Sequence, residues 1–576
     1  MIRLYRALLH LYPASFRVEY GPEMEAIFAR RRRDATGPLA RLGLWSHALW
    51  DVVINAAGVH VDILRQDVRY GMRALRRTPS FTLTAIAIVA IGIGANTAAF
   101  SVTDFVLLRP LPYPQPDRLV KMWERTPGYA RLEMSPENYR DWKRASTSFS
   151  SMGALWTIAS NLSMPGADPE RVTGAAVTWD VFPTLGVSPR MGRAFTEADD
   201  REVAAGTIIL SDSLWRSLFG AQPDVLGRVV TLDDTRYQVI GVMAPDVAFP
   251  SRQVEFWRPI QLSPGDNDRS NTYLTVIARL KPGVTLGDAS AEMNGIAARL
   301  AAQFPDQDRQ LGATIIPMRD DVPRQSRFLV LVLSGAAACV LLIVCANLAN
   351  LLLTRALGRR KEIAVRAAIG AGRERIVRQL GTESAMLAVG GGLLGVGLAY
   401  LALPALATLA PVTLPTSGTP AVDTRVLVVA ALLTAITAFA FGVAPALRLG
   451  RDADAAGLRE GARGGARRER LRSILVVSEL VASIVLLVGT GLLIQALWTV
   501  SRVDPGFQPD HVLTARTTLP WPTYAPTEKR AEFYRAVLSR VRALPGVASA
   551  GYISGLPFVV RGALWSVSLR GEPGGL

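Results

Sequence analysis

Five long apolar segments divide this chain, and each is long enough to cross a lipid bilayer as a helix. About 20 consecutive apolar residues suffice for one crossing. The only charged residue in all five segments is Glu479. The sequence therefore predicts a membrane α-helical protein with five transmembrane helices, at 81–103, 328–353, 384–410, 426–447 and 474–497.

Positive charge is concentrated beside these segments, on one side of each. The segments 65–80, 354–383 and 448–473 together carry +13 of the formal net charge of +16, whereas 109–327 holds 25 basic and 26 acidic residues. Lys and Arg beside membrane spans remain in the cytoplasm. The predicted topology is N-terminus, 354–383 and 448–473 inside, and 109–327, 411–425 and 498–576 outside.

The distribution of charge argues against nucleic acid as a partner, although the net charge is high. A nucleic-acid-binding protein needs a contiguous basic face on a folded domain. Here the positive charge lies next to the bilayer, where it interacts with anionic lipid and fixes orientation. The lipid bilayer is the partner that this pattern indicates.

The large outside region, 109–327, is expected to be an α+β domain with two subdomains. Ser135 and Ser211 stand at N-cap positions before helical segments, and Asp233-Asp234 lies between two strand-like runs in the manner of a hairpin turn. The predicted strands are 118–124, 207–210, 228–232, 236–242, 273–280 and 313–318, and the predicted helices begin at 136 and 212 and span 286–304.

Motifs for catalysis, nucleotide binding or metal binding are absent from the sequence. None of the five lysines follows a glycine, so the chain has no Walker-type phosphate loop. The four histidines form no H-E-x-x-H pattern, and no Cys/His cluster has zinc spacing. Cys339 and Cys345 lie on one predicted helix, where their spacing rules out a mutual disulfide. We therefore predict no catalytic residue, cofactor site or metal site.

Polar residues within or beside the apolar segments are the candidates for intramembrane sites. Asn347 and Asn350 are expected to hydrogen-bond across helices. Glu479 is expected to be an interfacial acid paired with Arg472 rather than a proton relay, and Asp104 is expected to be hydrated. The glycines of the first and third segments are expected to allow close helix packing.

The most distinctive stretch on the predicted cytoplasmic side is 359–371, Arg-Arg-Lys-Glu-Ile-Ala-Val-Arg-Ala-Ala-Ile-Gly-Ala. Ile363, Ala367 and Gly370 recur at helical spacing beside basic residues. From the residues alone, two interpretations remain open. The stretch is either an interfacial helix held by arginine–phosphate contacts or a docking helix for a cytoplasmic partner.

This stretch resembles the signature of the MacB/FtsX-type ABC transporter permeases. The similarity extends over nearly the whole chain and is closest to the duplicated orphan permeases, in which two half-permeases are fused behind an N-terminal helical segment. It rests on further stretches at 66–71, 77–79, 92–97, 108–113, 239–245, 345–353, 504–507 and 544–547.

The resemblance implies a MacB-like periplasmic core domain, an FtsX-like permease domain and a bacterial inner-membrane location with a cytoplasmic N-terminus. It also implies that a separate cytoplasmic ABC ATPase drives the motion, and that the helix after the second span couples to it. The residues that carry over as coupling candidates are Glu362, Ile363, Arg366, Ala368, Gly370 and Ala371.

The expected domain organisation follows from these segments. A short repeat, 115–120 and 508–513, indicates that the fifth span begins a second half-unit, which the chain contains only in part. The expected domains are 1–64, N-terminal helical segment; 65–108, lead-in and first span; 109–327, periplasmic core; 328–353, second span; 354–383, coupling helix; 384–447, third and fourth spans; 448–473, basic linker; 474–497, fifth span; and 498–576, incomplete second periplasmic domain.

Three functions remain open at this point. The resemblance implies a permease that couples ATP hydrolysis to export or extrusion of a periplasmic substrate. The alternative is a non-transporting protein that relays the state of the ATPase to periplasmic partners such as cell-wall hydrolases. A membrane-anchored periplasmic enzyme would need a cleft with paired titratable groups in 109–327, and the sequence does not indicate one.

Overall fold

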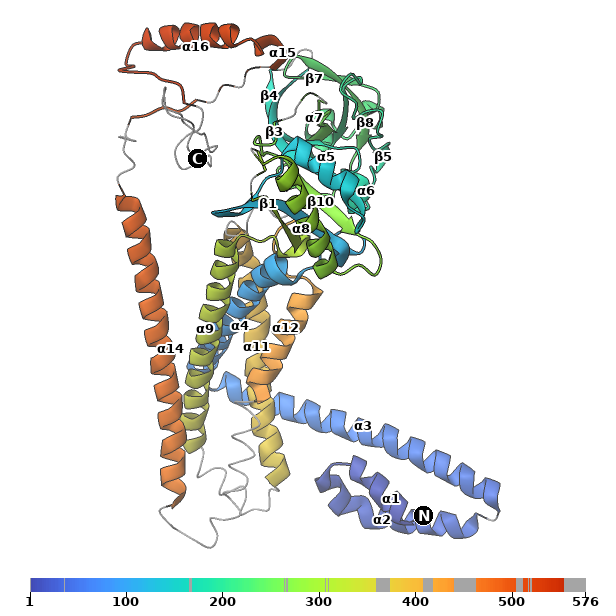
Figure 1. The fold of residues 1–576 in the computed structure, drawn as a ribbon. Helices are drawn as coiled ribbons and strands as arrows, with labels where there is room; N and C mark the ends of the chain where they lie inside the picture. The colour runs from blue at the N-terminus through green and yellow to red at the C-terminus, as the bar shows by residue number, and fades with distance from the viewer. Residues whose placement is uncertain are drawn as a thin grey trace. The chain divides into compact units, whose positions relative to one another are not determined.

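A computed structural model describes the protein, and it divides the chain into two compact units, which are described separately here. One unit contains the helices of residues 1–111 and 319–508, and the other contains the sheet domain of residues 112–318 and the segment after 509 (Figure 1). The structure describes all residues except 1, 36, 165–167, 264, 266–267, 306, 309, 359–372, 408–417, 440–462, 504–510, 516, 518, 520 and 554–576.

The chain begins with a three-helix module. Helices α1 (Ile2–Leu8) and α2 (Ala14–Asp34) pack on the first part of the long helix α3 (Pro38–Arg76). The ring of Phe28 stacks on Tyr5 at 4.0 Å and meets Trp45 edge-on at 5.4 Å. The predicted N-terminal segment is helical, but α3 continues without a break through position 64, where the sequence indicated a domain boundary.

Five of the described helices in the same unit are apolar. Four of the described helices are long and apolar enough to span a bilayer, whereas the described part of α12 is shorter and residues 440–462 beyond it lie outside the described residues. That the segment 426–447 makes a full span, which would bring the number of spans to five, therefore stays a prediction. The helices are α4 (Pro79–Thr103, continued by a π-helical turn to Leu108), α9 (Arg324–Gly358), α11 (Arg373–Ala407), α12 (Thr424–Ala438) and α14 (Arg463–Arg502).

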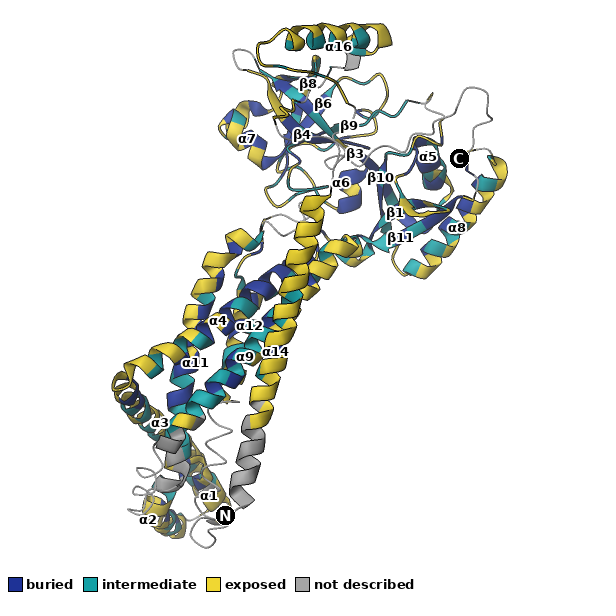
Figure 2. Ribbon diagram, turned by 90° about the vertical axis from the view of Figure 1, so that its left-hand side faces the viewer, coloured by how far each residue is buried: buried dark blue, intermediate teal, exposed yellow. Residues whose placement is uncertain are grey.

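Helix α4 is the most buried of the four spans, and α14 is the most exposed (Figure 2). Glycines set the close contact between α4 and α11. A Cβ atom on Gly395 would lie 2.9 Å from the carbonyl oxygen of Ala90, and one on Gly94 would lie 2.9 Å from that of Gly395. Only glycine permits this approach, as the sequence predicted for these segments.

The sheet domain is built on one mixed, 11-stranded sheet. Its main path runs β11-β1-β10-β3-β4-β9-β6-β8-β5; β2 pairs with β1, and β7 pairs with β3 and β8. The strands are β1 (Leu119–Thr126), β2 (Tyr129–Leu132), β3 (Phe149–Ser163), β4 (Glu170–Val177), β5 (Met191–Gly192), β6 (Thr207–Leu210), β7 (Val229–Leu232), β8 (Thr235–Val242), β9 (Phe256–Pro259), β10 (Thr275–Leu280) and β11 (Gly312–Pro317). The helices are α5 (Pro136–Ala145), α6 (Val181–Leu185), α7 (Asp212–Phe219) and α8 (Leu286–Gln303).

The described residues form two hydrophobic cores along this sheet, and the division into two subdomains stays a prediction. In the first, α5 and α8 cover β1, β10, β11 and the start of β3 around Trp142 and Met293. In the second, α7 packs on β6 to β9 around Phe256 and Leu214. The 15-residue strand β3 contributes to both cores and so joins them in a single sheet.

The predicted local signals are confirmed within the sheet domain. The hydroxyl oxygens of Ser135 and Ser211 accept hydrogen bonds from the backbone N–H groups of Asn138 and Leu214, at 3.2 and 3.1 Å. Strands β7 and β8 form the expected antiparallel hairpin, with the left-handed backbone of Asp233 and Asp234 between them.

The described part of the chain beyond α14 contains two helices, α15 (Trp521–Tyr524) and α16 (Thr527–Arg542). Helix α16 has no buried residue. The prediction that 498–576 begins a second periplasmic domain stays a prediction.

Candidate functional site

The six candidate coupling residues lie in the segment 359–372, outside the described residues. These residues are Glu362, Ile363, Arg366, Ala368, Gly370 and Ala371. The structure does describe both flanks of this segment, which are the last turns of α9 and the first turns of α11. The end of the helical unit that contains these flanks is called the basic end here.

A set of charged contacts joins four helices at the basic end. Arg355, in the last turns of α9, lies 3.8 Å from the buried carboxylate of Glu383 on α11. The guanidinium of Arg355 also lies 4.3 Å from the centre of the Phe81 ring on α4. Arg378 on α11 donates a hydrogen bond of 2.5 Å to Asp67 on α3. A displacement of either flank would therefore reach α3 and α4 through these contacts.

A second ion-pair cluster lies at the opposite end of α4. The predicted hydration of Asp104 is wrong, because its side chain is only 4% exposed and lies 3.7 Å from Arg109 and 3.8 Å from Arg425. Arg109 also pairs with Asp423, which is the N-cap of α12 and accepts a hydrogen bond from the backbone of Val426. The cluster connects the end of α4 to the start of α12.

A polar pair joins α9 to α14 within their apolar spans. The amide nitrogen of Asn347 donates a hydrogen bond of 2.8 Å to the carboxylate of Glu479. The predicted pairing of Glu479 with Arg472 stays a prediction, because the side chain of Arg472 lies outside those that the structure describes. The amide oxygen of Asn350 is buried and has no hydrogen-bond partner among the described residues.

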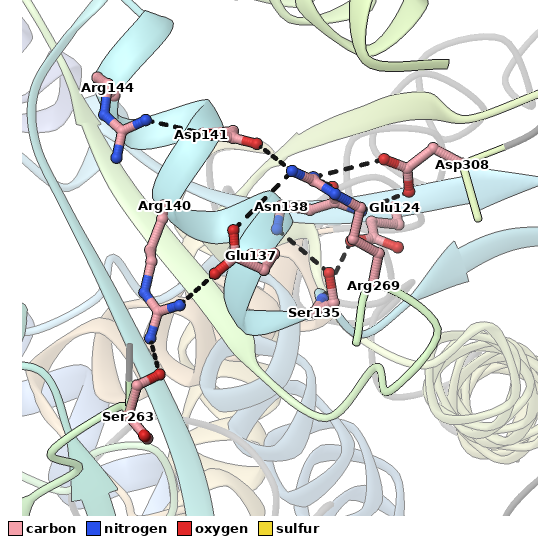
Figure 3. Close-up of polar contacts among 10 residues, drawn as sticks. All are labelled: Glu124, Ser135, Glu137, Asn138, Arg140, Asp141, Arg144, Ser263, Arg269 and Asp308. Atoms are coloured by element: carbon pink, nitrogen blue, oxygen red, sulfur yellow. Dashed lines mark hydrogen bonds and ion pairs between the residues drawn. The ribbon is translucent and has the colours of Figure 1, made fainter. Parts of the chain in front are cut away.

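The sheet domain contains a buried charged cluster that the sequence did not indicate (Figure 3). Arg269, only 6% exposed, lies 2.6 Å from Asp141 and 3.5 Å from Asp308 and donates a hydrogen bond to the amide oxygen of Asn138. The amide nitrogen of Asn138 donates to Asp308 and to Glu124, both at 3.0 Å. The cluster thus ties α5 to β1 and to the two loops that contain Arg269 and Asp308.

Burial dominates the electrostatics of this cluster. It raises the pKa of the Glu124 carboxyl to about 7, although hydrogen bonds from Asn138 and Ser135 favour the charged form. Burial also raises the pKa of Asp308. The hydrogen bond from Asn138 and the positive charge of Arg269 oppose this rise. The guanidinium of Arg269 lies 3.9 Å from the centre of the Phe304 ring, which covers it with apolar surface.

A cavity of about 310 Å³ also lies in the sheet domain, beside α5. Its lining includes Lys143, which pairs with Asp180, and Asp200, which accepts hydrogen bonds from the backbone N–H groups of Trp179 and Gln261. Burial raises the pKa of Asp200 to about 6. Among the described residues, no group of three or more His, Cys, Asp or Glu side chains could hold a metal ion.

Comparison with known proteins matches the two parts of the chain to two families. Residues 82–296 match the MacB-like periplasmic core domain, and residues 334–452 match the FtsX-like permease C-terminal domain. Together these matches cover more than half of the chain and include α4, the described strands and helices of the sheet domain up to β10, and helices α9, α11 and α12.

Similar proteins include ATP-binding/permease proteins of bacterial export systems. The macrolide export ATP-binding/permease protein MacB of Shewanella oneidensis is 28% identical over 213 residues, which are 36% of this chain and 32% of that protein. MacB of Rhodospirillum rubrum is 26% identical over 277 residues, 48% of this chain and 41% of that protein. The chain thus spans about a third to two fifths of the length of these curated relatives.

A solved structure, the periplasmic region of MacB from Actinobacillus actinomycetemcomitans, covers 36% of this chain and 91% of that chain, with 13% identity and a TM-score of 0.28. At this level the structural similarity carries no argument about function. The two domain matches and their order along the chain show that this protein belongs to the MacB/FtsX-type ABC transporter permeases. It corresponds to the permease part of that family and is a multi-pass inner-membrane protein.

Proposed function

We propose that this chain is the membrane subunit that couples ATP hydrolysis by a separate ABC ATPase to export or extrusion outside the bilayer. The observation that carries the proposal is the set of contacts at the basic end. The segment 359–372 connects two helices whose flanks are held by buried or half-buried ion pairs, Arg355–Glu383 and Arg378–Asp67.

The coupling step follows from these contacts. An ATPase bound at 359–372 moves the end of α9 and the start of α11 at the same time, because both helix ends adjoin the segment that it holds. Arg355 then transmits the motion to α4 through the Phe81 ring, and the glycine contacts at Gly94 and Gly395 keep α4 and α11 moving as a unit. Helix α4 leads directly into the sheet domain, which receives the displacement.

The proposed orientation places the basic end in the cytoplasm and the sheet domain in the periplasm. The arginine-rich segments beside the spans support this topology, because Lys and Arg near membrane spans remain inside. In this orientation the coupling segment faces the ATPase, and the cluster around Asp104 faces the periplasm.

The test is recovery of the cognate ATPase with the tagged full-length protein from native membranes. The double variant Glu362→Ala/Arg366→Ala removes one acid and one base from the coupling segment. We expect it to lose most of the ATPase and most of the stimulation of ATP hydrolysis that the wild-type protein gives.

The matched control is Glu532→Ala/Arg535→Ala on α16, which removes the same two charges elsewhere. The control should recover the ATPase as the wild type does. Full recovery by the coupling variant, or equal loss in both variants, would overturn the assignment of this segment.

A further inference from the structure

The N-terminal module contains a groove that its own core does not fill. The core of the module is formed by Tyr5, Leu9, Phe28 and Val52. Beside it, α2 and α3 enclose a groove of about 490 Å³. Tyr12, Phe16, Met24 and Val59 line this groove and also belong to the core or to the side chains packed against it.

One wall of the groove is a ladder of aromatic side chains. The rings of Tyr12 and Phe16 stack at 4.8 Å, and those of Phe16 and Tyr20 lie at 4.8 Å in a tilted arrangement. Tyr20 is 42% exposed, and Ile27, one turn beyond Glu23 on the same face, is 56% exposed. This apolar face continues for about three helical turns.

The rim of the groove is acidic. Glu23 of α2 and Asp51 and Asp62 of α3 line it. Among the described residues Glu23 and Asp51 form no salt bridge; Asp51 accepts a hydrogen bond from Asn55, and Asp62 lies 3.7 Å from the exposed Arg65. The rim of the groove is therefore negatively charged, although the chain as a whole has a net charge of +16.

The spacing of the carboxylates indicates the shape of the ligand. Asp51 and Asp62 are 11 residues apart on α3, which places them about 16 Å apart along the helix axis. A small organic cation cannot reach both ends of such a rim. A membrane surface is disfavoured as well, because anionic lipid is repelled by carboxylates. A helix with an apolar stripe can pack on the aromatic wall, and its basic residues about three turns apart can pair with the carboxylates of the rim.

We propose that this groove is a docking site for a basic amphipathic helix of a partner protein. The apolar face of that helix lies against Phe16 and Tyr20, and its Lys or Arg side chains pair with Glu23, Asp51 and Asp62. The proposal concerns the N-terminal module alone and does not depend on the coupling function.

The experiment measures binding of a fluorescein-labelled Leu/Lys amphipathic peptide, about five helical turns long, to the full-length protein in phosphatidylcholine nanodiscs. A peptide of the same composition in scrambled order and one with Glu in place of Lys are the probe controls. We expect saturable binding of the amphipathic peptide only.

The variant Glu23→Gln/Asp51→Asn should weaken this binding about tenfold, the effect of two exposed ion pairs. Asp34→Asn/Glu528→Gln, which removes two exposed acids that do not line the groove, should bind as the wild type does. Tyr20→Ala should also weaken binding several-fold without a change of charge.

Three results would overturn the proposal. The first is the absence of saturable binding by the wild-type protein. The second is equal affinity of the groove variant and its control. The third is protection of α2 from hydrogen exchange by phosphatidylserine nanodiscs but not by the peptide, which would place the groove on the membrane instead.

Discussion

Asn347 of α9 and Glu479 of α14 share a hydrogen bond of 2.8 Å between two helices that are otherwise apolar along their spans. Helix α14 exposes most of its side chains, so this pair is a specific polar link between it and the neighbouring helix. Hydrogen bonds between membrane helices contribute about 1 kcal/mol on average or somewhat less.

The first prediction concerns this pair. In a double-mutant cycle of Asn347→Ala and Glu479→Ala, measured by unfolding of the full-length protein in detergent, we expect a coupling energy of about 1 kcal/mol. Glu479→Gln keeps an amide oxygen as acceptor and should be close to the wild type. Additive effects of the two alanine substitutions would show that the contact contributes nothing.

The second prediction concerns the glycine contact of α4 and α11. Gly395→Ala places a methyl group 2.9 Å from the carbonyl oxygen of Ala90 and should destabilise the helical unit by about 1–3 kcal/mol. Gly397, two residues further along α11, has nothing within 4 Å of its Cβ position. Gly397→Ala should therefore be neutral or slightly stabilising, because alanine favours the helix. Thermal unfolding of the two variants should differ accordingly; identical melting temperatures would contradict the close approach of the helices.

The third prediction concerns Arg109, which contacts both Asp104 and Asp423. Arg109→Ala removes one of the two bases beside the buried Asp104 carboxylate, while Arg425 remains 3.8 Å from it, and should cost about 2 kcal/mol. The exposed pair Arg228–Asp224 of the sheet domain provides the comparison, and Arg228→Ala should change stability by about 0.5 kcal/mol or less. Chemical denaturation of the full-length protein checks both values. Equal effects of the two substitutions would show that the burial of Asp104 has no energetic consequence.

The fourth prediction is a pH dependence of the sheet domain. Burial raises the pKa of Glu124 to about 7 from its ordinary value of 4.5, so between these pH values the folded chain holds a proton that the unfolded chain has released. The free energy of unfolding therefore falls as the pH rises from about 4.5 to 7 and is level above it, by about 3 kcal/mol for a shift of this size. Asp308 and Asp200, with pKa values also raised, act in the same direction.

Hydrogen exchange of the β1 and α5 amides, corrected for intrinsic exchange rates, measures this effect in the intact protein. Protection should decrease from pH 5 to pH 7, and Glu124→Gln should reduce the slope. Glu133→Gln, at an exposed acid just before α5, should leave the slope unchanged. Protection that increases with pH over this window would contradict the assignment.

Local signals in the sequence predicted much of the sheet domain, because they act over a few residues. The N-cap serines 135 and 211 and the turn at Asp233-Asp234 fix their elements without tertiary contacts. Strand β4 was missed, because its residues are small and show no alternation. A tertiary contact explains the small residue at position 174. A Cβ on Gly174 would lie 2.3 Å from the ring of Phe256, which packs directly on the strand.

The charged contacts of the site were missed for a similar reason. Asp104 was expected to be hydrated because an acid near the end of a span is ordinarily accessible, yet Arg425, more than 300 residues later, lies against it. The hydrogen bond that the structure describes for Glu479 reaches Asn347 on another helix, more than 130 residues earlier. Charge placement along the chain predicts which end of a helix is basic, but only the packing of helices decides which charges pair.

The proposed function requires that the segment after α9 faces the cytoplasm, where an ATPase can reach it, while the sheet domain lies outside. Cys339 and Cys345 are the only native cysteines, so replacing both with alanine gives a background for site-directed labelling. Ala371→Cys reports on the coupling segment, and Val203→Cys reports on the sheet domain, where this side chain is 95% exposed. In intact spheroplasts a membrane-impermeant maleimide should label Val203→Cys at once and Ala371→Cys only after permeabilisation. Labelling of Ala371→Cys from the outside would contradict the proposed orientation, and with it the coupling to an intracellular motor.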